Sequence, residues 1–383
     1  MTIDPAYFYA PAGPPPLVTH RSERIIVELL DEFDNLRGQL AGVQVGGTIE
    51  QNVHRQVRGG GNIVLVEDDS LPWPIDGVTT PLRLSDVDWY KDRIRVSWSV
   101  EGGPRWALGT FIVSAPSVSF GDGFTSLSAE LLDKLTVPQQ DAVEASYSLA
   151  PGTVVTDAVE ALLLTTGETR MAITESAATL GSGFVWEAGT SKLRVINDLL
   201  ASINYFSLWC DGSGQYRAEP YVRPDDRTPS WRFEEGETSI HSPEWTREQD
   251  LYNVPNRVVL VSQGDGETEA LTSTYPATEA ESDEIMPKLG YSARGRWIVH
   301  PETGVEANTQ AVLDSLARQR LADLADSVAN LSVLHAAVPL ELNNTVYFRS
   351  QGHEALAVVQ ELAYTLGEGE LCRSSWREVG GGM

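Results

Sequence analysis

Histidines are the side chains of this sequence with which general acid–base or metal chemistry is most often built. A metal pair or a catalytic base commonly has a second ligand nearby, and another histidine at i+3 or i+4 is the simplest helical arrangement. None of the six histidines has such a neighbour, so we interpret each as a surface residue or a hydrogen-bonded core residue. They are His20, His54, His241, His300, His335 and His353.

Carboxylates are abundant, with 54 Asp and Glu residues. A glycoside hydrolase needs two carboxylates on opposite sides of a cleft. In a chain this acidic, random pairs at a suitable separation are expected, so we interpret the carboxylates as solvated surface charges. Those that stand out by local density are Asp31, Glu32, Asp34, Glu67, Asp68 and Asp69.

The two cysteines, Cys210 and Cys372, do not form a metal site by themselves, and no CxxC or HExxH spacing places other ligands beside them. A free buried thiol is the preferred interpretation of Cys210, although a disulfide between the two remains an alternative. The turn Asp211–Gly214 lacks the spaced acidic ligands and distal Glu of a calcium loop. With no GxSxG, GxxxxGK[ST] or GxGxxG motif either, the sequence predicts no catalytic, cofactor-binding or metal-binding residue.

Tryptophans have two interpretations, packing in a core or stacking against sugars on a surface. Five of the ten Trp residues lie at or beside segments that we expect to be strands or turns, where core packing is the ordinary explanation. They are Trp89, Trp98, Trp106, Trp186 and Trp209.

The net charge of −26 argues against tight binding to nucleic acid, because phosphate backbones are bound by clustered cations. The acidity fits either simple solubility or a surface that DNA passes without sticking. The first residues show no basic stretch followed by an apolar run, so we expect no secretory signal. No stretch approaches the roughly 18 apolar residues that span a membrane, so we expect no membrane insertion.

The spacing of apolar residues changes along the chain, from a pattern typical of strands to one typical of helices. Residues 24–133 are typical of strands, and Arg93–Val100 alternates apolar and polar side chains, as a half-buried strand does. The turn Glu101–Pro104 then predicts a β-hairpin with the strand that follows. Residues 142–223 instead show helical spacing, with Thr153 or Thr156 capping one helix and Ser191 capping another, before a hairpin.

Strands return after Trp231. The polar tract 263–290 predicts a long exposed loop, and a helix over about 309–330, opened by Asn308 or Thr309, precedes three further strands. We therefore predict a mainly β chain with an α+β part, in three domains. These are a β-rich, tube-like antiparallel barrel or sandwich over 1–141, a small α+β domain over 142–223, and a second β-rich, tube-like module with one long helix over 224–383. The sequence shows no internal repeat.

The order of these landmarks resembles minor tail proteins of long-tailed phages of actinobacteria, a family similar to the baseplate hubs of contractile tails. The resemblance runs over most of the chain. It is carried by GGPRWALGTFIVSAP (102–116), SLSAELLDKLTVPQQD (126–141) with Asp133, Lys134 and Leu135 closing the first β module, and FVWEAGTSKLRVINDLLASINYFSLWCDGSGQYRAEPYVRP (184–224), followed by NVPNRVVLV (253–261) and RGRW (294–297).

The resemblance implies a structural virion protein without enzymatic activity, a homotrimeric hub in which two tube-like modules per chain make a ring of six at the tail tip. It would join the sixfold tube to a threefold tip and line part of the channel through which double-stranded DNA passes without specific binding. The implied partners are the distal tail protein, the tape-measure protein and a central fibre or tip protein, with assembly in the host cytoplasm. The alternative is a tail protein that binds or cleaves cell-wall carbohydrate, which the ten Trp residues and many carboxylates would fit.

Overall fold

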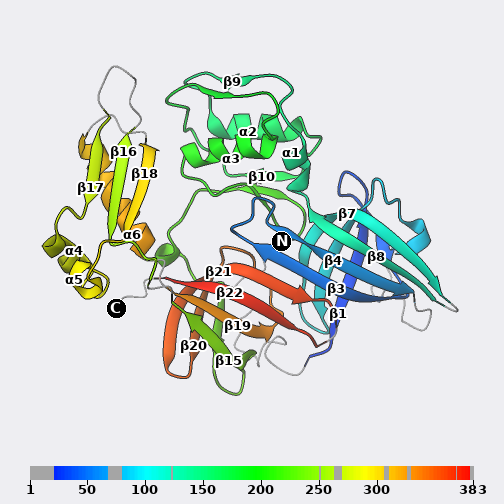
Figure 1. Cartoon of the computed structure of the whole chain (residues 1–383). Coiled ribbons are helices and arrows are strands. Elements are labelled where there is room, and N and C mark those ends of the chain that lie inside the picture. Colours follow the sequence, from blue (N-terminus) through cyan, green and yellow to red (C-terminus); the bar gives the residue numbers. More distant parts are fainter. Residues whose placement is uncertain are drawn as a thin grey trace.

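The structure is a computed structural model of the chain. It describes residues 21–67, 80–121, 124–249, 252–262, 270–305, 310–325, 329–367 and 369–379. Figure 1 shows a large β sheet, a small α+β domain above it, and a separate lobe beside it. Strands predominate among the described residues, so the predicted mainly β class is confirmed.

Two sets of strands build the large sheet. The first set comprises β1 (Glu23–Leu30), β2 (Leu36–Leu40), β3 (Val43–Asn52), β4 (Gly59–Glu67), β5 (Pro81–Leu82), β6 (Arg93–Val100), β7 (Arg105–Gly121) and β8 (Phe124–Asp133). The second set comprises β14 (Trp231–Glu234), β15 (His241–Glu248), β19 (Asn330–Ala336), β20 (Thr345–Ser350), β21 (His353–Thr365) and β22 (Leu371–Val379). The hairpin predicted from the alternation in Arg93–Val100 is present as the antiparallel pair β6–β7.

The two sets belong to one sheet because β21 pairs antiparallel with β3, from Glu361 opposite Asn52 to Thr365 opposite Thr48. They also share one hydrophobic core, in which the rings of Trp98 and Tyr364 lie 6.2 Å apart. The sheet does not close into a barrel, since among the described strands its path ends at β15 and at β5. Of the two expected forms, a barrel or a sandwich, the closed barrel is therefore wrong. The two β modules share one core, because strand pairing continues from one half into the other.

The two halves of the sheet repeat one strand order. The order β3-β4-β8-β7-β6-β1 in the first half corresponds to β15-β19-β22-β21-β20-β14 in the second. The long strands β7 and β21 each contain a bulge, at Ser114–Ser117 and at Val359–Glu361. The repeats differ at one end, where β1 pairs antiparallel with β6 but β14 pairs parallel with β20.

The α+β domain lies between the two halves in sequence and has its own core. Its elements are α1 (Thr136–Gln140), β9 (Tyr147–Leu149), α2 (Val155–Leu164), β10 (Met171–Ile173), β11 (Phe184–Trp186), α3 (Lys192–Ser202), β12 (Trp209–Cys210) and β13 (Tyr216–Ala218). Ser191 caps α3 as predicted, its hydroxyl accepting from the Arg194 amide. The predicted cap of α2 is wrong: Val154 holds that position without a side-chain bond, and Thr156 lies inside the helix.

The lobe is a third unit, with its own core, that the sequence interpretation did not separate from the second β module. It comprises β16 (Arg257–Ser262), β17 (Thr272–Tyr275), α4 (Glu279–Ile285), α5 (Tyr291–Arg294), β18 (Val299–Val305) and α6 (Gln310–Ala325). It is inserted between β15 and β19, and its two connections lie side by side because Glu248 pairs with Asn330.

The expectation of an exposed loop over 263–290 is wrong for much of its described part, and residues 263–269 lie outside the described residues. Residues 272–285 contain β17 and α4, and Met286 and Leu289 are buried in the lobe's core. The polar residues are explained in part by the start of α4, where the N-cap Thr278 hydroxyl accepts from the Glu281 amide and the Glu281 carboxylate accepts from the Ala277 amide. The predicted helix over 309–330 is α6, although its predicted cap residues Asn308 and Thr309 lie outside the described part.

Candidate functional site at the junction of the sheet and the α+β domain

Four charged side chains meet where the large sheet contacts the α+β domain, and together they form what we call the junction cluster. Asp34 lies in the β1–β2 turn, Arg93 begins β6, Lys134 directly follows β8, and Glu168 lies in the loop after α2. All four are buried, with Lys134 fully so at 0% exposure. Three of them come from the sheet side and Glu168 from the domain, so the cluster crosses the junction.

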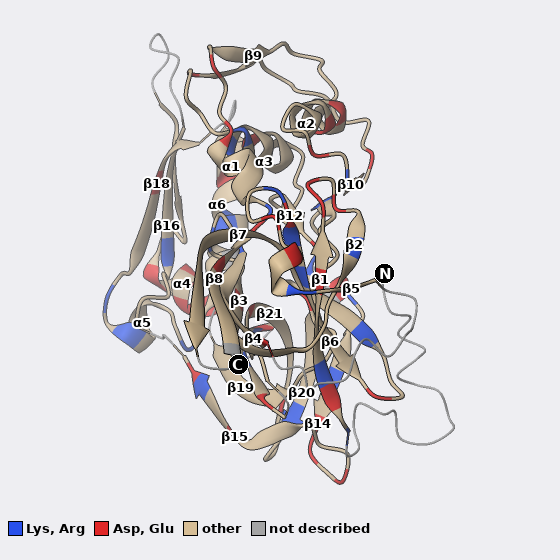
Figure 2. Ribbon diagram, turned by 90° about the vertical axis from the view of Figure 1, so that its right-hand side faces the viewer, with Lys and Arg blue, Asp and Glu red and all other residues tan. Residues whose placement is uncertain are grey.

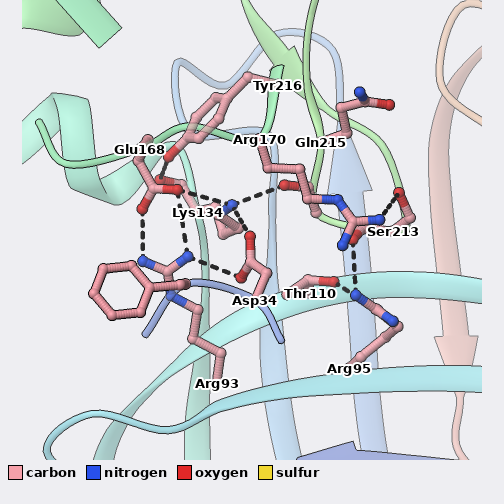
Figure 3. Close-up of polar contacts among 12 residues, drawn as sticks. Asp34, Arg93, Arg95, Thr110, Lys134, Glu168, Arg170, Ser213, Gln215 and Tyr216 are labelled. Carbon is pink, nitrogen blue, oxygen red and sulfur yellow. Dashed lines mark hydrogen bonds and ion pairs between the residues drawn. The ribbon is translucent and has the colours of Figure 1, made fainter. Parts of the chain in front are cut away.

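Within the junction cluster each cation contacts both acids (Figure 3). Arg93 Nη1 lies 2.8 Å from Asp34 Oδ1, and Arg93 Nη2 lies 2.6 Å from Glu168 Oε1. Lys134 Nζ lies 2.5 Å from Asp34 Oδ2 and 3.0 Å from Glu168 Oε2. Lys134 Nζ also donates to the Gly214 carbonyl at 2.8 Å. Two positive and two negative charges therefore balance in a closed ring of contacts.

This balance explains how four charges remain buried. Burial alone would lower the pKa of Arg93, but its hydrogen bonds to Glu168 and Asp34 outweigh burial and raise that pKa above its usual value. A buried pair gains little over apolar packing, whereas a buried charge that has lost its partner is costly. The cluster therefore specifies how the domain seats on the sheet, because displacing Glu168 would leave Arg93 and Lys134 short of an acid.

Hydrogen bonds to backbone carbonyls extend the same junction along β6 and β7. Arg95 Nη2 donates to the Ser213 carbonyl at 3.1 Å, and the Thr110 hydroxyl donates to the Gly212 carbonyl at 3.1 Å. A Cβ added at Gly212 would lie 2.1 Å from the Ala107 carbonyl oxygen, so only glycine fits there. The turn Asp211–Gly214, compared above with a calcium loop, is thus a docking turn that presents its carbonyls to the sheet.

A small cavity of about 30 Å³ lies beside this turn, where both halves of the sheet meet the α+β domain. Arg58, Asp133, Cys210 and Glu341 are among its lining residues. Burial raises the pKa of Asp133 to about 6, opposed by hydrogen bonds from the Leu135 and Gly59 amides and by the charge of Arg58. A space of this size holds a water molecule but no substrate. Among the described residues, no group of three or more His, Cys, Asp or Glu side chains could hold a metal.

The histidines considered above lie in several places, and only His241 and His335 of the described ones stand opposite each other, in the β15–β19 pair. His335 is fully buried in the sheet, with Nε2 2.7 Å from the Ser374 hydroxyl, and burial lowers its pKa to about 4. His353 contacts Glu378 at 2.7 Å, and His241 is buried nearby. His54 is exposed and His300 is half-buried, whereas His20 is outside the described residues. They do not assemble a catalytic or metal-binding group.

The other candidate residues are also separated. Asp31 accepts hydrogen bonds from Asn35, and Asp34 belongs to the junction cluster. Glu32 is exposed and Glu67 is half-buried. Asp68 and Asp69 lie outside the described residues. Cys210 and Cys372 are free, which rules out the disulfide alternative in this structure.

The tryptophans mostly pack inside. Trp98, Trp106 and Trp186 are buried, and Trp89 and Trp209 are half-buried, so these five rings do not form an exposed sugar-stacking platform. Among the described helices, none is long and apolar enough to cross a membrane. Acidic and basic residues are scattered over the sheet, the domain and the lobe (Figure 2).

Sequence reasoning missed the junction cluster, in particular Arg93 and Glu168. One signal was available, since Asp133 and Lys134 stand between the apolar pair Leu131–Leu132 and Leu135, where exposed charges are unexpected. The partners of Lys134 lie 100 positions before it and 34 after it, and no local pattern connects them.

Solved structures of several other proteins have a similar architecture. The tail protein from Neisseria meningitidis MC58 matches with a TM-score of 0.62 over 93% of this chain and 97% of its own, at 13% identity. The 43 kDa tail protein of prophage MuSo2 from Shewanella oneidensis matches with a TM-score of 0.60, at 10% identity, over 93% and 98% of the two chains. Prophage tail protein gp18 from Listeria monocytogenes EGD-e matches with a TM-score of 0.51, at 12% identity, over 92% and 94%.

The chain has the fold of these tail proteins. The likeness extends over nearly the whole length of each, so it includes the large sheet, the α+β domain and the lobe together. At 10–13% identity, the likeness establishes the fold alone. No protein-family model matches the sequence, and no curated protein matches it.

Proposed function

We propose that the chain is a structural protein of a phage tail, specifically a homotrimeric hub at the tail tip. The observation that carries the proposal is the repeated strand order of the two sheet halves, in a fold shared along its whole length with tail proteins. Two similar modules in each of three chains give six similar modules, which is the number required to seat on a sixfold tube.

In this proposal the hub joins the tube and the distal tail protein to a threefold central tip or fibre, and it holds the end of the tape-measure protein. Double-stranded DNA passes through its axis without specific binding, which the net charge of −26 per chain favours. The hub has no catalytic role. Its place is the tail tip of the virion, after assembly in the host cytoplasm.

The junction cluster supports a scaffolding role. Two domains fixed by a buried, balanced set of charges present their outer surfaces in a constant relation. Closure of a ring requires a rigid protomer of this kind, because small errors in the orientation of its domains would add up from one copy to the next.

The deciding experiment is the absolute mass of the purified chain by size-exclusion chromatography with light scattering, across a concentration series. A mass near 125 kDa, three times the 41.8 kDa of one chain, is the expected result. Chemical cross-linking of purified tails gives the same number inside the particle. A single copy of the chain in assembled tails would overturn the hub proposal.

A further inference from the structure

The contact between the two sheet halves shows how one module meets the next. Along β21, the first half, from His353 to Val358, pairs with β20. After the bulge, the second half, from Glu361 to Thr365, pairs with β3 on that same edge. The module-to-module junction is thus made by the far half of the long bulged strand.

The far half of β7 occupies the corresponding place in the first sheet half. Residues Arg105–Ile112 pair with β6, and after the bulge the strand continues as Ser117–Gly121 along β8. No strand in the described part of the chain pairs with the other edge of Ser117–Gly121. Among the described strands, the edge that β21 gives to β3 therefore has no partner in β7 (Figure 1).

Side chains after the bulge are buried in β21, whose edge is paired with β3, and exposed in β7. Leu362 and Tyr364, the second and fourth residues from the end of the β21 bulge, are 1% and 2% exposed. Their counterparts after the β7 bulge, Val118 and Phe120, are 42% and 83% exposed. Two apolar side chains stand in water where the repeat buries two.

The complementary edge is present on the second sheet half. β3 pairs with β4 on one side and with β21 on the other. Its counterpart β15 pairs with β19 on one side, and no described strand pairs with its other side. Each chain thus makes the β21–β3 junction once internally. Among its described strands it also has one unpaired edge of each kind, in β7 and in β15.

We propose that Ser117–Gly121 of β7 in one copy pairs antiparallel with the C-terminal part of β15 in a second copy. This repeats between chains the junction that β21 and β3 make within one chain, and it rests on the proposed hub function. Because each copy contributes one edge of each kind, the contact is head-to-tail, and copies join until a ring closes.

A second copy is the occupant favoured by the composition of the open β7 edge. Ser117–Gly121 contains no charged residue, whereas natural sheet edges that must stay alone are protected by charges, chiefly lysine. The far half of β7 is therefore built to be paired. In the second copy, β15 is the counterpart of the strand that already accepts the equivalent partner.

The first test is Phe120→Asp, which places a carboxylate at the centre of the proposed contact. We expect the variant to remain folded, because Phe120 is 83% exposed, but its mass by light scattering to fall from three chains to one. The matched control is Tyr90→Asp, since Tyr90 is 98% exposed and lies outside the contact. The control should keep the wild-type mass.

The second test is covalent and does not depend on a destabilising change. Ser119→Cys is combined in one chain with Thr246→Cys, Arg247→Cys or Glu248→Cys, which samples neighbouring registers along β15. Under mild oxidation we expect at least one pair to give a denaturation-resistant trimer, which the single variants and the wild-type chain do not give.

The outcomes separate the two proposals. A trimeric wild type whose Phe120→Asp variant stays trimeric, with no cross-link from any pair, would overturn the β7–β15 contact and leave the hub standing. A wild-type chain that is a single copy both in solution and in cross-linked tails would remove both.

Discussion

At the scale of single residues, the junction cluster is the most demanding feature of the molecule. Lys134 is completely buried, and its side chain contacts both acids and, through the Gly214 carbonyl, the docking turn. The phenol of Tyr216 donates to the Lys134 carbonyl at 2.8 Å, and Lys134 Nζ lies 4.8 Å from the centre of the Tyr216 ring. Lys134 is therefore held by contacts on several sides, so the surrounding residues cannot easily rearrange to compensate for a substitution there.

Replacing Lys134 with methionine keeps the stem and removes the charge. Asp34 and Glu168 would then share only Arg93, and we expect unfolding to become easier by about 3–5 kcal/mol. Chemical denaturation measures the loss, with Lys91→Met as the matched control. Lys91 is exposed, so its change should stay within about 0.5 kcal/mol.

The double variant Lys134→Met with Glu168→Gln tests charge balance itself. It leaves Asp34 opposite Arg93, one charge of each sign, so its loss should be smaller than the sum of the two single losses. Strict additivity would show that the four charges do not act as a unit.

His335 predicts a dependence on pH. Burial lowers its pKa to about 4 from 6.5, so the folded ring stays neutral in a range where the unfolded chain takes up a proton. The stability of the sheet should therefore fall as the pH drops from about 6.5 to about 4, by roughly 3 kcal/mol for this residue. Denaturant titrations followed by tryptophan fluorescence are suitable, because the Trp376 ring lies 5.9 Å away.

Other buried groups titrate in the same range, and Asp133 acts in the opposite direction. Its pKa, raised to about 6, means that protonation on acidification favours the folded state. The measurement is therefore the difference in pH dependence between the wild type and His335→Asn, with His54→Asn as the surface control. If the His335→Asn curve parallels the wild-type curve, the His335 prediction fails.

At the scale of elements, local patterns predicted what local geometry determines. The alternation in Arg93–Val100 and the turn after it fixed the β6–β7 hairpin, and Ser191 was recognised as the start of α3. The tract around β17 and α4 was misinterpreted because its polar composition hid a helix start at Thr278. The prediction of a loop rested on the high content of polar and charged residues. β17 and α4 are short, so they contain too few apolar positions to show the spacing of a strand or a helix.

The cap of α3 gives a prediction at this scale. Ser191→Ala removes the acceptor for the Arg194 amide, which should destabilise the α+β domain by about 1 kcal/mol. Ser148, on the exposed side of β9, provides the control, since Ser148→Ala removes a hydroxyl from a strand without a capping role. Thermal unfolding and protease susceptibility of the domain report the difference.

At the scale of the whole molecule, the sequence could not reveal which parts share a core. The two sheet halves join through residues more than 300 positions apart, and the repeated strand order carries no sequence repeat. Strands pair through their backbone amide and carbonyl groups, and almost any side chains are compatible with such pairing. For the same reason the lobe, which interrupts a hairpin of the second half, was assigned to the β module that surrounds it.

The lobe should be removable. Glu248 and Asn330 are paired neighbours at its base, so replacing residues 250–328 with a short Asn-Gly turn would restore a plain β15–β19 hairpin. We expect the sheet to fold, with its near-ultraviolet dichroism retained and its unfolding temperature lowered by only a few degrees. Loss of the sheet signal would show that the lobe is required for the core.

The pairing of β21 with β3 also sets an order of events during synthesis. Ribosomes add about 5–20 residues per second, so Asn52 emerges on the order of tens of seconds before its partner Glu361. Throughout that interval the amide edge of β3 has no partner from its own chain. Nascent chains on one message are therefore exposed to premature pairing with each other through the edge of β3.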